Sequence, residues 1–126
     1  MTALRWAIVI IDLDPTVGRE QGGRRRALVV SYEAFHSSGM ATVCPISVRE
    51  ARYPGEVGFP RGHAGQTKDS VILCHQVRTL DLRRVTTYEV RGRPQFVTDP
   101  SIRAAVRDAL SRHLGLDMDA ARDGSV

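Results

Sequence analysis

A glycine- and arginine-rich loop between two apolar runs is the first segment whose residue types suggest chemistry. It covers residues 18–25 and reads Gly-Arg-Glu-Gln-Gly-Gly-Arg-Arg. Glycines let a backbone approach a ligand closely. The backbone N–H groups and the arginine guanidinium groups can then donate hydrogen bonds to phosphate oxygens. No Gly-Lys-Ser/Thr follows and no helix pattern begins there, so the loop is neither a P-loop nor a dinucleotide fingerprint. An anion-binding loop and a solvated hairpin tip both stay open at this point.

The overall charge favours an anionic partner. The formal net charge is +4, and Lys68 is the only lysine, so arginine supplies almost all the positive charge. Arginine pairs its donors with phosphate or carboxylate oxygens, which favours nucleic acid or an acidic protein as partner. A coding bias toward arginine would raise the arginine count equally. The positions of the arginines must therefore show whether they bind an anionic partner.

The cysteines and histidines show no metal-site spacing. Cys44 and Cys74 lie in apolar runs, and no Cys/His pair has the spacing of a zinc site. Free buried thiols in a reducing compartment are therefore expected. The longest apolar run, Ala7–Ile11, is far too short to cross a bilayer, and no signal peptide is visible. We expect a cytoplasmic protein without metal or cofactor.

The elements that would position these residues are mostly strands. Dense β-branched runs bounded by turn residues predict buried strands, and Pro45 inside one of them indicates an edge position or a bulge. The expected strands are Trp6–Leu13, Ala27–Ser31, Met40–Ile46, a short one within Tyr53–Pro60, Ser70–Cys74 and Thr86–Val90.

A single helix is expected at the end of the chain. Asp99 is a suitable N-cap with Pro100 at the first helical position, and Gly115 is suited to end the helix. Ile102, Val106, Ala109 and Leu110 fall on one face of it. Strands followed by one helix predict a mainly β fold, a small twisted antiparallel barrel closed by the helix. The domain is expected to cover residues 1–116, with a polar tail over 117–126.

Three segments, in order and at compatible spacing, resemble the MazF/PemK (Kid-like) family of type II toxin–antitoxin endoribonucleases, the mRNA interferases. The first covers residues 12–31 and includes the arginine-rich loop; the second is residues 44–47, Cys-Pro-Ile-Ser. The third covers residues 69–81 and reads Asp-Ser-Val-Ile-Leu-Cys-His-Gln-Val-Arg-Thr-Leu-Asp. The resemblance extends over roughly residues 8–114.

The resemblance implies a bacterial toxin with an SH3-like barrel of the CcdB/Kid/MazF type, acting as a homodimer. Such proteins cut single-stranded RNA (mRNA, possibly rRNA or tRNA) at short sequences, independently of the ribosome and of metal. They leave a 2′,3′-cyclic phosphate and a 5′-hydroxyl. A cognate antitoxin with an acidic, initially disordered segment covers the RNA groove.

Metal-free RNA cleavage explains the residue types of the implied site. The neighbouring 2′-OH attacks, so the enzyme must take its proton, neutralise the phosphorane and protonate the leaving 5′-oxygen. Arg25 matches the family's essential arginine and would stabilise the phosphorane; Ser47 matches a catalytic-site threonine whose hydroxyl can bond a phosphate oxygen. The implied RNA-binding residues are Arg19, Glu20, Gln21, Arg24, Arg26, Gln76 and Arg78.

The sequence departs from the family pattern around His75. Many members have Asp there, and some relatives have an Arg where Leu73 stands, so that acid–base pair cannot be carried over. A histidine at this position can serve as base or acid, or can contact RNA or the partner subunit from the rim. Arg26 replaces a Pro that usually follows the essential arginine, which adds charge and removes stiffness.

Two other functions stay open. A gyrase-directed toxin resembling CcdB would share the fold but act through its C-terminal helix, without needing Arg25 and Ser47. A non-catalytic RNA-binding barrel would bind RNA in a salt-dependent manner and cleave nothing.

Overall fold

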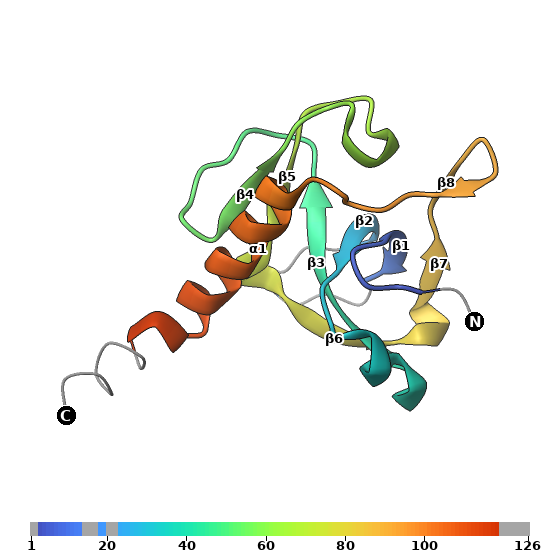
Figure 1. Ribbon diagram of the computed structural model, residues 1–126, viewed down its shortest axis with the longest axis horizontal. Helices are drawn as coiled ribbons and strands as arrows, with labels where there is room; N and C mark the ends of the chain where they lie inside the picture. The colour runs from blue at the N-terminus through green and yellow to red at the C-terminus, as the bar shows by residue number, and fades with distance from the viewer. Residues whose placement is uncertain (1–2, 14–17, 20–22, 119–126) are drawn as a thin grey trace.

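The apolar runs of the sequence form an antiparallel sheet of seven strands in the part of the chain that the structure describes. The computed structural model describes residues 3–13, 18–19 and 23–118 (Figure 1). Its central strands are β1 (Ile8–Asp12), β2 (Arg24–Val29) and β3 (Met40–Ser47). The others are β4 (Glu56–Phe59), β5 (Ser70–Leu73), β6 (Arg78–Asp81) and β7 (Val85–Thr87), with β8 (Glu89–Val90) and β9 (Arg93–Pro94) as a separate hairpin.

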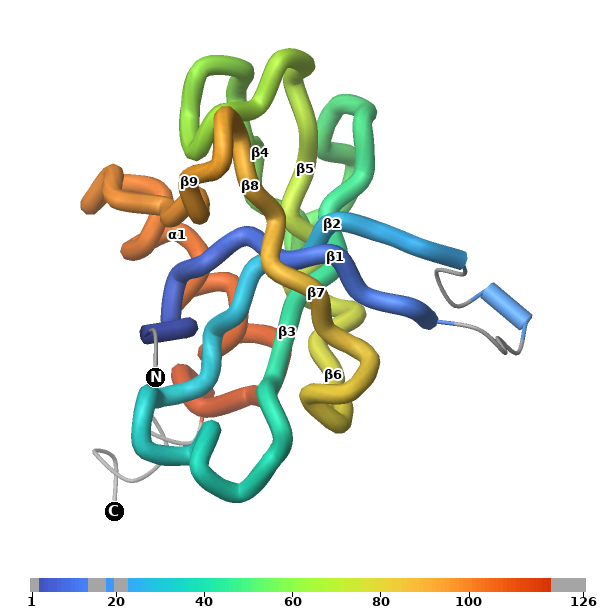
Figure 2. Tube along the Cα trace, turned by 90° about the vertical axis from the view of Figure 1, so that its right-hand side faces the viewer, coloured from blue at the N-terminus to red at the C-terminus, as the bar shows by residue number. Residues whose placement is uncertain are grey.

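The sheet is open, and the prediction of a closed barrel needs correction. The strand order is β4-β5-β3-β2-β1-β7, with β6 also paired to β3. Within the described residues β4 and β7 are the two ends of this path and do not pair with each other. Figure 2 shows β4 and β5 running across the direction of β1 and β2, so the sheet is strongly twisted.

β3 is the hub of the sheet, which makes the prediction of an edge position for Pro45 wrong. One side of β3 pairs with β2, and Ala27 faces Pro45 there. On the other side, Met40–Val43 pair with β6 while Ile46 and Ser47 pair with β5. Pro45 lies in the gap where β3 changes partner, so a proline without an N–H is tolerated in a central strand.

Each face of the sheet carries its own apolar cluster. The cluster beneath α1 (Pro100–His113) contains Ile8, Leu28, Phe59 and both free cysteines. The cluster on the opposite face is built from alternate residues of the same strands, including Val9, Ile11, Ala27, Val29 and Val43. Burial on both faces explains why these strands read as nearly continuous apolar runs.

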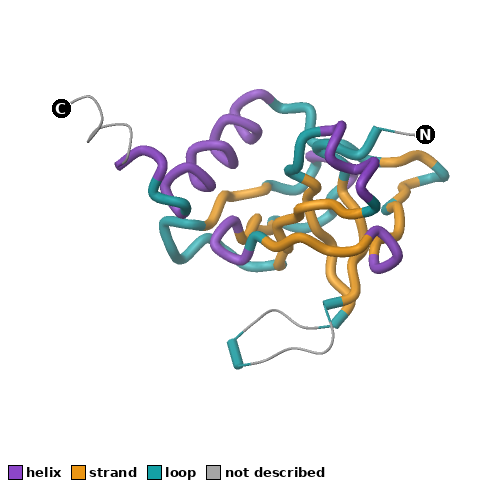
Figure 3. The backbone as a smooth tube through the Cα atoms, turned by 90° about the horizontal axis from the view of Figure 1, so that it is seen from below, coloured by secondary structure: helices purple, strands orange, loops and turns teal. Residues whose placement is uncertain are grey.

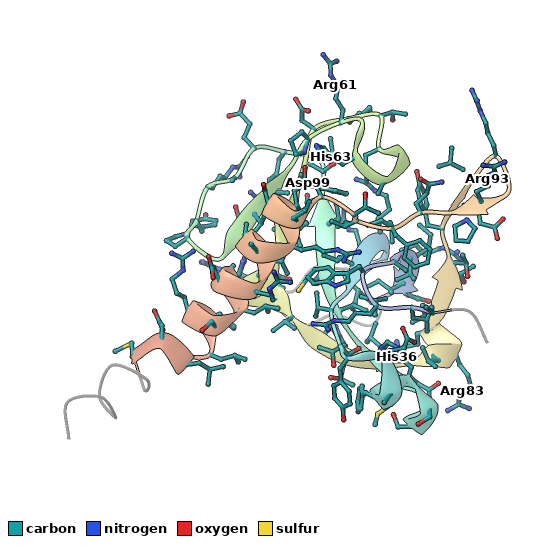
Figure 4. The ribbon with its side chains drawn as sticks, viewed as in Figure 1. His36, Arg61, His63, Arg83, Arg93 and Asp99 are labelled. Carbon is teal, nitrogen blue, oxygen red and sulfur yellow. The ribbon has the colours of Figure 1, made fainter. Side chains whose placement is uncertain are left out.

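α1 begins and ends where the sequence predicts. The Asp99 carboxylate accepts hydrogen bonds from the N–H groups of Ser101 and Ile102, at 2.7 and 3.3 Å, and these bonds lower its pKa. Figure 4 shows Asp99 at the first turn, with His63 beside it. Gly115 follows the helix with a left-handed φ of 74°. Ile102, Val106 and Ala109 are buried, as expected, and Leu110 is half-buried.

The short connections contain four 3₁₀ turns that the sequence did not reveal. They are η1 (Glu33–Ser38), η2 (His63–Gly65), η3 (Cys74–Gln76) and η4 (Leu82–Arg84). The expected strand Thr86–Val90 divides into β7 and β8. In η1 the carboxylate of Glu33 accepts the N–H groups of Arg5 and Leu4. The bond from Arg5, followed by the one with the His36 ring, is the main cause that lowers its pKa to about 2. This turn therefore fastens the N-terminal segment to the sheet.

Trp6 joins the N-terminal segment to the helix. It is buried although its φ of 69° lies in the left-handed region. Its N–H donates to the Val29 carbonyl, and its own carbonyl accepts from Val97, both at 2.8 Å. Three guanidinium groups lie over the ring at 5.2–5.9 Å from its centroid, those of Arg5, Arg103 and Arg107.

Candidate functional site

The start of β2, beside the end of β1, carries three of the arginines that the sequence singled out. These strand ends project from the body of the molecule, away from α1 (Figure 3). A hollow of about 590 Å³ lies against β2 and the end of β3. We call it the arginine groove; its lining residues are Ile10, Arg24, Arg25, Arg26, Ile46, Ser47 and Val48. Arg24 and Arg25 are exposed, so their charges face solvent along this groove.

Strand register brings Arg25 and Ser47 together. Ala27 pairs with Pro45 across β2 and β3. Arg25 on β2 and Ser47 on β3 each lie two residues beyond this last pair, so each shares the sheet face of its paired neighbour because side chains alternate with a period of two. Both residues line the arginine groove. A permanent cation and a hydroxyl group thus border the same hollow, which suits a phosphate group.

Arg26 is held differently from its neighbours. It is half-buried, and its guanidinium donates to the Ser70 hydroxyl on β5 at 3.3 Å. Burial is the main cause that lowers the pKa of Arg26, and the charge interaction with Tyr88 acts in the opposite direction. The Ser70 hydroxyl in turn donates to the Lys68 carbonyl at 3.1 Å. Arg26 therefore lines the groove with its guanidinium tied to β5.

A second hollow adjoins the first along β3. Its volume is about 390 Å³, and we call it the histidine groove. Pro45, two residues from Ser47 on the same face of β3, belongs to its lining. The full lining is Leu13, Arg19, Pro45, His75, Gln76, Val77 and Arg78. The two hollows together gather every implied site residue that the structure describes, whereas Glu20 and Gln21 lie outside the described residues.

His75 lines the histidine groove and a smaller cavity beside α1, and it is not among the residues that line the arginine groove. Its ring meets the Tyr53 ring edge-on, with centroids 6.3 Å apart. A Cβ at Gly55 would lie 2.9 Å from the His75 Cβ, so only glycine fits there without a shift. In the described structure the buried Nδ1 atom has no hydrogen-bond partner. A catalytic imidazole is normally oriented through this second nitrogen, so the geometry favours a contact role over that of a base.

Comparison with known proteins identifies the family. The sequence pattern of the PemK-like, MazF-like toxins of type II toxin–antitoxin systems matches residues 4–114. That span includes both grooves and α1. The chain belongs to this family.

Individual relatives agree with the family assignment. The chain is 34% identical to the endoribonuclease EndoA of Bacillus subtilis over 89 residues, covering 68% of this chain and 77% of EndoA. The crystal structure of MazF from Deinococcus radiodurans matches with a TM-score of 0.69 and 35% identity, over 88% of this chain and 94% of that one. A MazE–MazF complex from the same organism matches with a TM-score of 0.64 and 31% identity, over 88% and 94% of the two chains.

One feature of this MazF-like chain was not visible from any motif: the loop of residues 48–55 between β3 and β4. Val48 lines the arginine groove, while Pro54 and Gly55 line the small cavity beside His75. The loop closes on the carboxylate of Glu56, whose side chain is fully buried. Its ion pair with Arg49 is the main cause that lowers the pKa of Glu56 to about 2. This carboxylate therefore stays charged at all but strongly acidic pH.

Two further properties concern the described part of the chain as a whole. Among residues 3–13, 18–19 and 23–118, no group of three or more His, Cys, Asp or Glu side chains is arranged to hold a metal ion. No helix in these ranges is long and apolar enough to span a membrane.

Proposed function

We propose that this chain is the toxin of a type II toxin–antitoxin pair and cleaves single-stranded RNA in the cytoplasm by attack of the 2′-OH on the adjacent phosphate. The observation that carries the proposal is the meeting of Arg25 and Ser47 in one open, cationic groove. The expected products are a 2′,3′-cyclic phosphate and a 5′-hydroxyl. Since the nucleophile belongs to the RNA itself, the reaction needs no metal-activated water.

In this proposal each groove residue has a separate task. Arg25 binds the scissile phosphate and stabilises the phosphorane, because a guanidinium stays charged throughout. The Ser47 hydroxyl donates to a phosphate oxygen. Arg24 and Arg26 extend the positive surface along the backbone of the RNA. Glu20 and Gln21 are proposed to contact bases from the adjoining loop.

The histidine groove would hold the nucleotides beside the scissile phosphate. Arg19 and Arg78 can bind phosphates there, and the Gln76 amide can hydrogen-bond a base edge. His75 would contribute a ring nitrogen as a contact to RNA. The shared use of β3 by both hollows supports a continuous track for a single strand.

We also propose a homodimer that forms through an apolar face next to the histidine groove. A hollow of about 530 Å³ lies there, and Val77 belongs to its lining as well as to that of the histidine groove. Tyr32 and Leu114, also in the lining, are 63% and 60% exposed. A second copy of the chain on this face would bury them and bring two histidine grooves side by side, as a two-fold axis requires. A cognate antitoxin, like the one in the MazE–MazF complex, would block the grooves.

The test is cleavage of a long single-stranded RNA in excess EDTA, with the fragment ends identified. We expect discrete cuts with 2′,3′-cyclic phosphate ends. Arg25→Ala should lower the rate about 10²–10³-fold, the usual effect of removing a donor to a developing charge. Arg93→Ala removes an exposed arginine from the β8–β9 hairpin and should leave the rate unchanged.

RNA binding without cleavage by the folded protein would instead favour the non-catalytic RNA-binding alternative. Inhibition of gyrase would favour the CcdB-like one. Equal activity of Arg25→Ala and the unmodified protein would contradict the role of the arginine groove.

A further inference from the structure

Glu56 gathers hydrogen bonds from the whole loop of residues 48–55. Its carboxylate accepts from both terminal nitrogens of Arg49, one of them at 2.8 Å. It also accepts from the backbone N–H groups of Arg52 and Tyr53, at 2.7 and 3.3 Å. Arg49 additionally donates to the Glu50 carbonyl at 2.9 Å. A loop without regular secondary structure is thus closed around one buried carboxylate, which we call the Glu56 clamp.

The clamp fixes the loop against the segment that carries His75. Glu56 begins β4 and pairs there with Leu73 of β5. The Gly55 carbonyl accepts the N–H of Cys74 at 3.0 Å, directly before His75. The close approach of Gly55 to the His75 Cβ leaves no slack between loop and η3. A shift of the loop would therefore move the wall of the histidine groove.

The loop presents two apolar side chains that the fold itself does not use. Val48 is 53% exposed beside Ser47 in the arginine groove, and Tyr53 is 60% exposed beside His75. Exposed aromatic and aliphatic groups next to a cationic groove are suited to pack on unstacked RNA bases. Val48 therefore lies at the arginine groove, and Tyr53 lies against a residue that lines the histidine groove. A rigid loop would hold both against the same strand of RNA.

We propose that Glu56, together with Arg49, is a positioning residue for RNA selectivity: the clamp holds Val48 and Tyr53 in place to select the bases around the scissile phosphate. This inference rests on the proposed ribonuclease function. Neither clamp residue lines a groove in the described structure, so their effect on RNA acts through the loop. A loosened loop loses contacts to the bases, while Arg25 and Ser47 keep their places on β2 and β3.

The first measurement concerns the loop alone and needs no RNA. Trypsin cuts after exposed arginines when the chain can open locally, and the rate follows the population of the open form. Glu56→Gln and Arg49→Gln should raise cutting after Arg52 by roughly tenfold, read by mass spectrometry. Arg49→Lys keeps the charge and should stay protected. The matched control is Asp81→Asn, which breaks another arginine–carboxylate pair, that with Arg83, far from the loop in sequence.

The second measurement concerns selectivity. On a long RNA, Glu56→Gln and Arg49→Gln should cut at additional sequences. On a short preferred substrate their KM should rise roughly three- to tenfold with kcat nearly unchanged, the pattern of lost uniform binding. Arg49→Lys should retain the original cleavage pattern, and Asp81→Asn should match the unmodified protein. If Glu56→Gln does not fold, the two Arg49 variants decide between the outcomes, because the Arg49 side chain is 20% exposed and belongs to neither apolar cluster.

Three outcomes would overturn the inference. Continued protection of Arg52 in both variants would show that the clamp does not hold the loop. An open loop with unchanged KM and cleavage pattern would show that the loop does not select bases. Absence of cleavage by the unmodified protein would overturn the proposed function and the selectivity with it, while the trypsin result would still show whether Glu56 closes the loop.

Discussion

Arg25 and Ser47 come from separate sequence segments and line one hollow because β2 and β3 pair directly beside them, at Ala27 and Pro45. Sequence resemblance pointed to both residues, and the structure places them in one groove; their catalytic roles stay predictions. The surroundings of His75 were not predictable, because Tyr53 and Gly55 reach it through a loop that no motif marks. Its unpartnered Nδ1 is a product of tertiary packing, which local sequence patterns do not encode.

The geometry around His75 leads to a prediction at this scale. Because no described group orients its ring through Nδ1, His75→Ala should lower the cleavage rate by less than about tenfold, and mainly through KM. His75→Asp restores the residue type common in relatives and should likewise leave kcat within that range. A loss on the order of 10²-fold in kcat for His75→Ala would identify it as the general base or acid instead.

Elements with a strong local sequence pattern were predicted, whereas features that depend on which strands pair with each other were not. β1 and β2 follow from their β-branched runs, and α1 follows from Asp99, Pro100 and the spacing of its apolar residues. The central place of Pro45 could not be inferred, since it depends on β3 exchanging β6 for β5 at that position. β6 itself was missed because its alternation of polar and apolar residues spans only Arg78–Asp81.

The N-cap of α1 gives a prediction at the scale of the element. Asp99→Ala removes the acceptor for two helix N–H groups and should lower the Tm by a few degrees. Asp99→Asn keeps an equally good cap and should preserve the Tm at pH 7. RNA cleavage at low temperature should be unaffected in both, because Asp99 lines neither groove. Equal Tm values for the Ala and Asn variants would contradict the importance of the cap.

The whole molecule is an open, twisted sheet with α1 covering one face and two cationic grooves along β3. The sheet order and the two apolar clusters account for the buried strands. Openness of the sheet was not predictable, since strand patterns alone do not show whether the edge strands meet. The exposed apolar face around Tyr32 and Leu114 is left uncovered by the monomer.

This face predicts the oligomeric state. Light scattering should give a mass near twice the 13.9 kDa of one chain. Leu114→Asp should shift the protein to a monomer, because a charge buried in an apolar contact is costly. Val48→Asp, which places the same charge on another exposed apolar residue, should leave the mass unchanged. A monomeric unmodified protein at micromolar concentration would contradict the dimer, and a shift only on adding an antitoxin would assign the face to that partner.

The arrangement around Trp6 has a practical consequence for all of these measurements. It is the only tryptophan of the chain, and its ring is enclosed by guanidinium groups from the N-terminal segment and from α1. Its fluorescence emission therefore reports the separation of α1 from the N-terminal segment and should shift to longer wavelength when that contact opens. Each variant thus carries an unlabelled optical probe of its own integrity, one whose indole lines neither RNA groove.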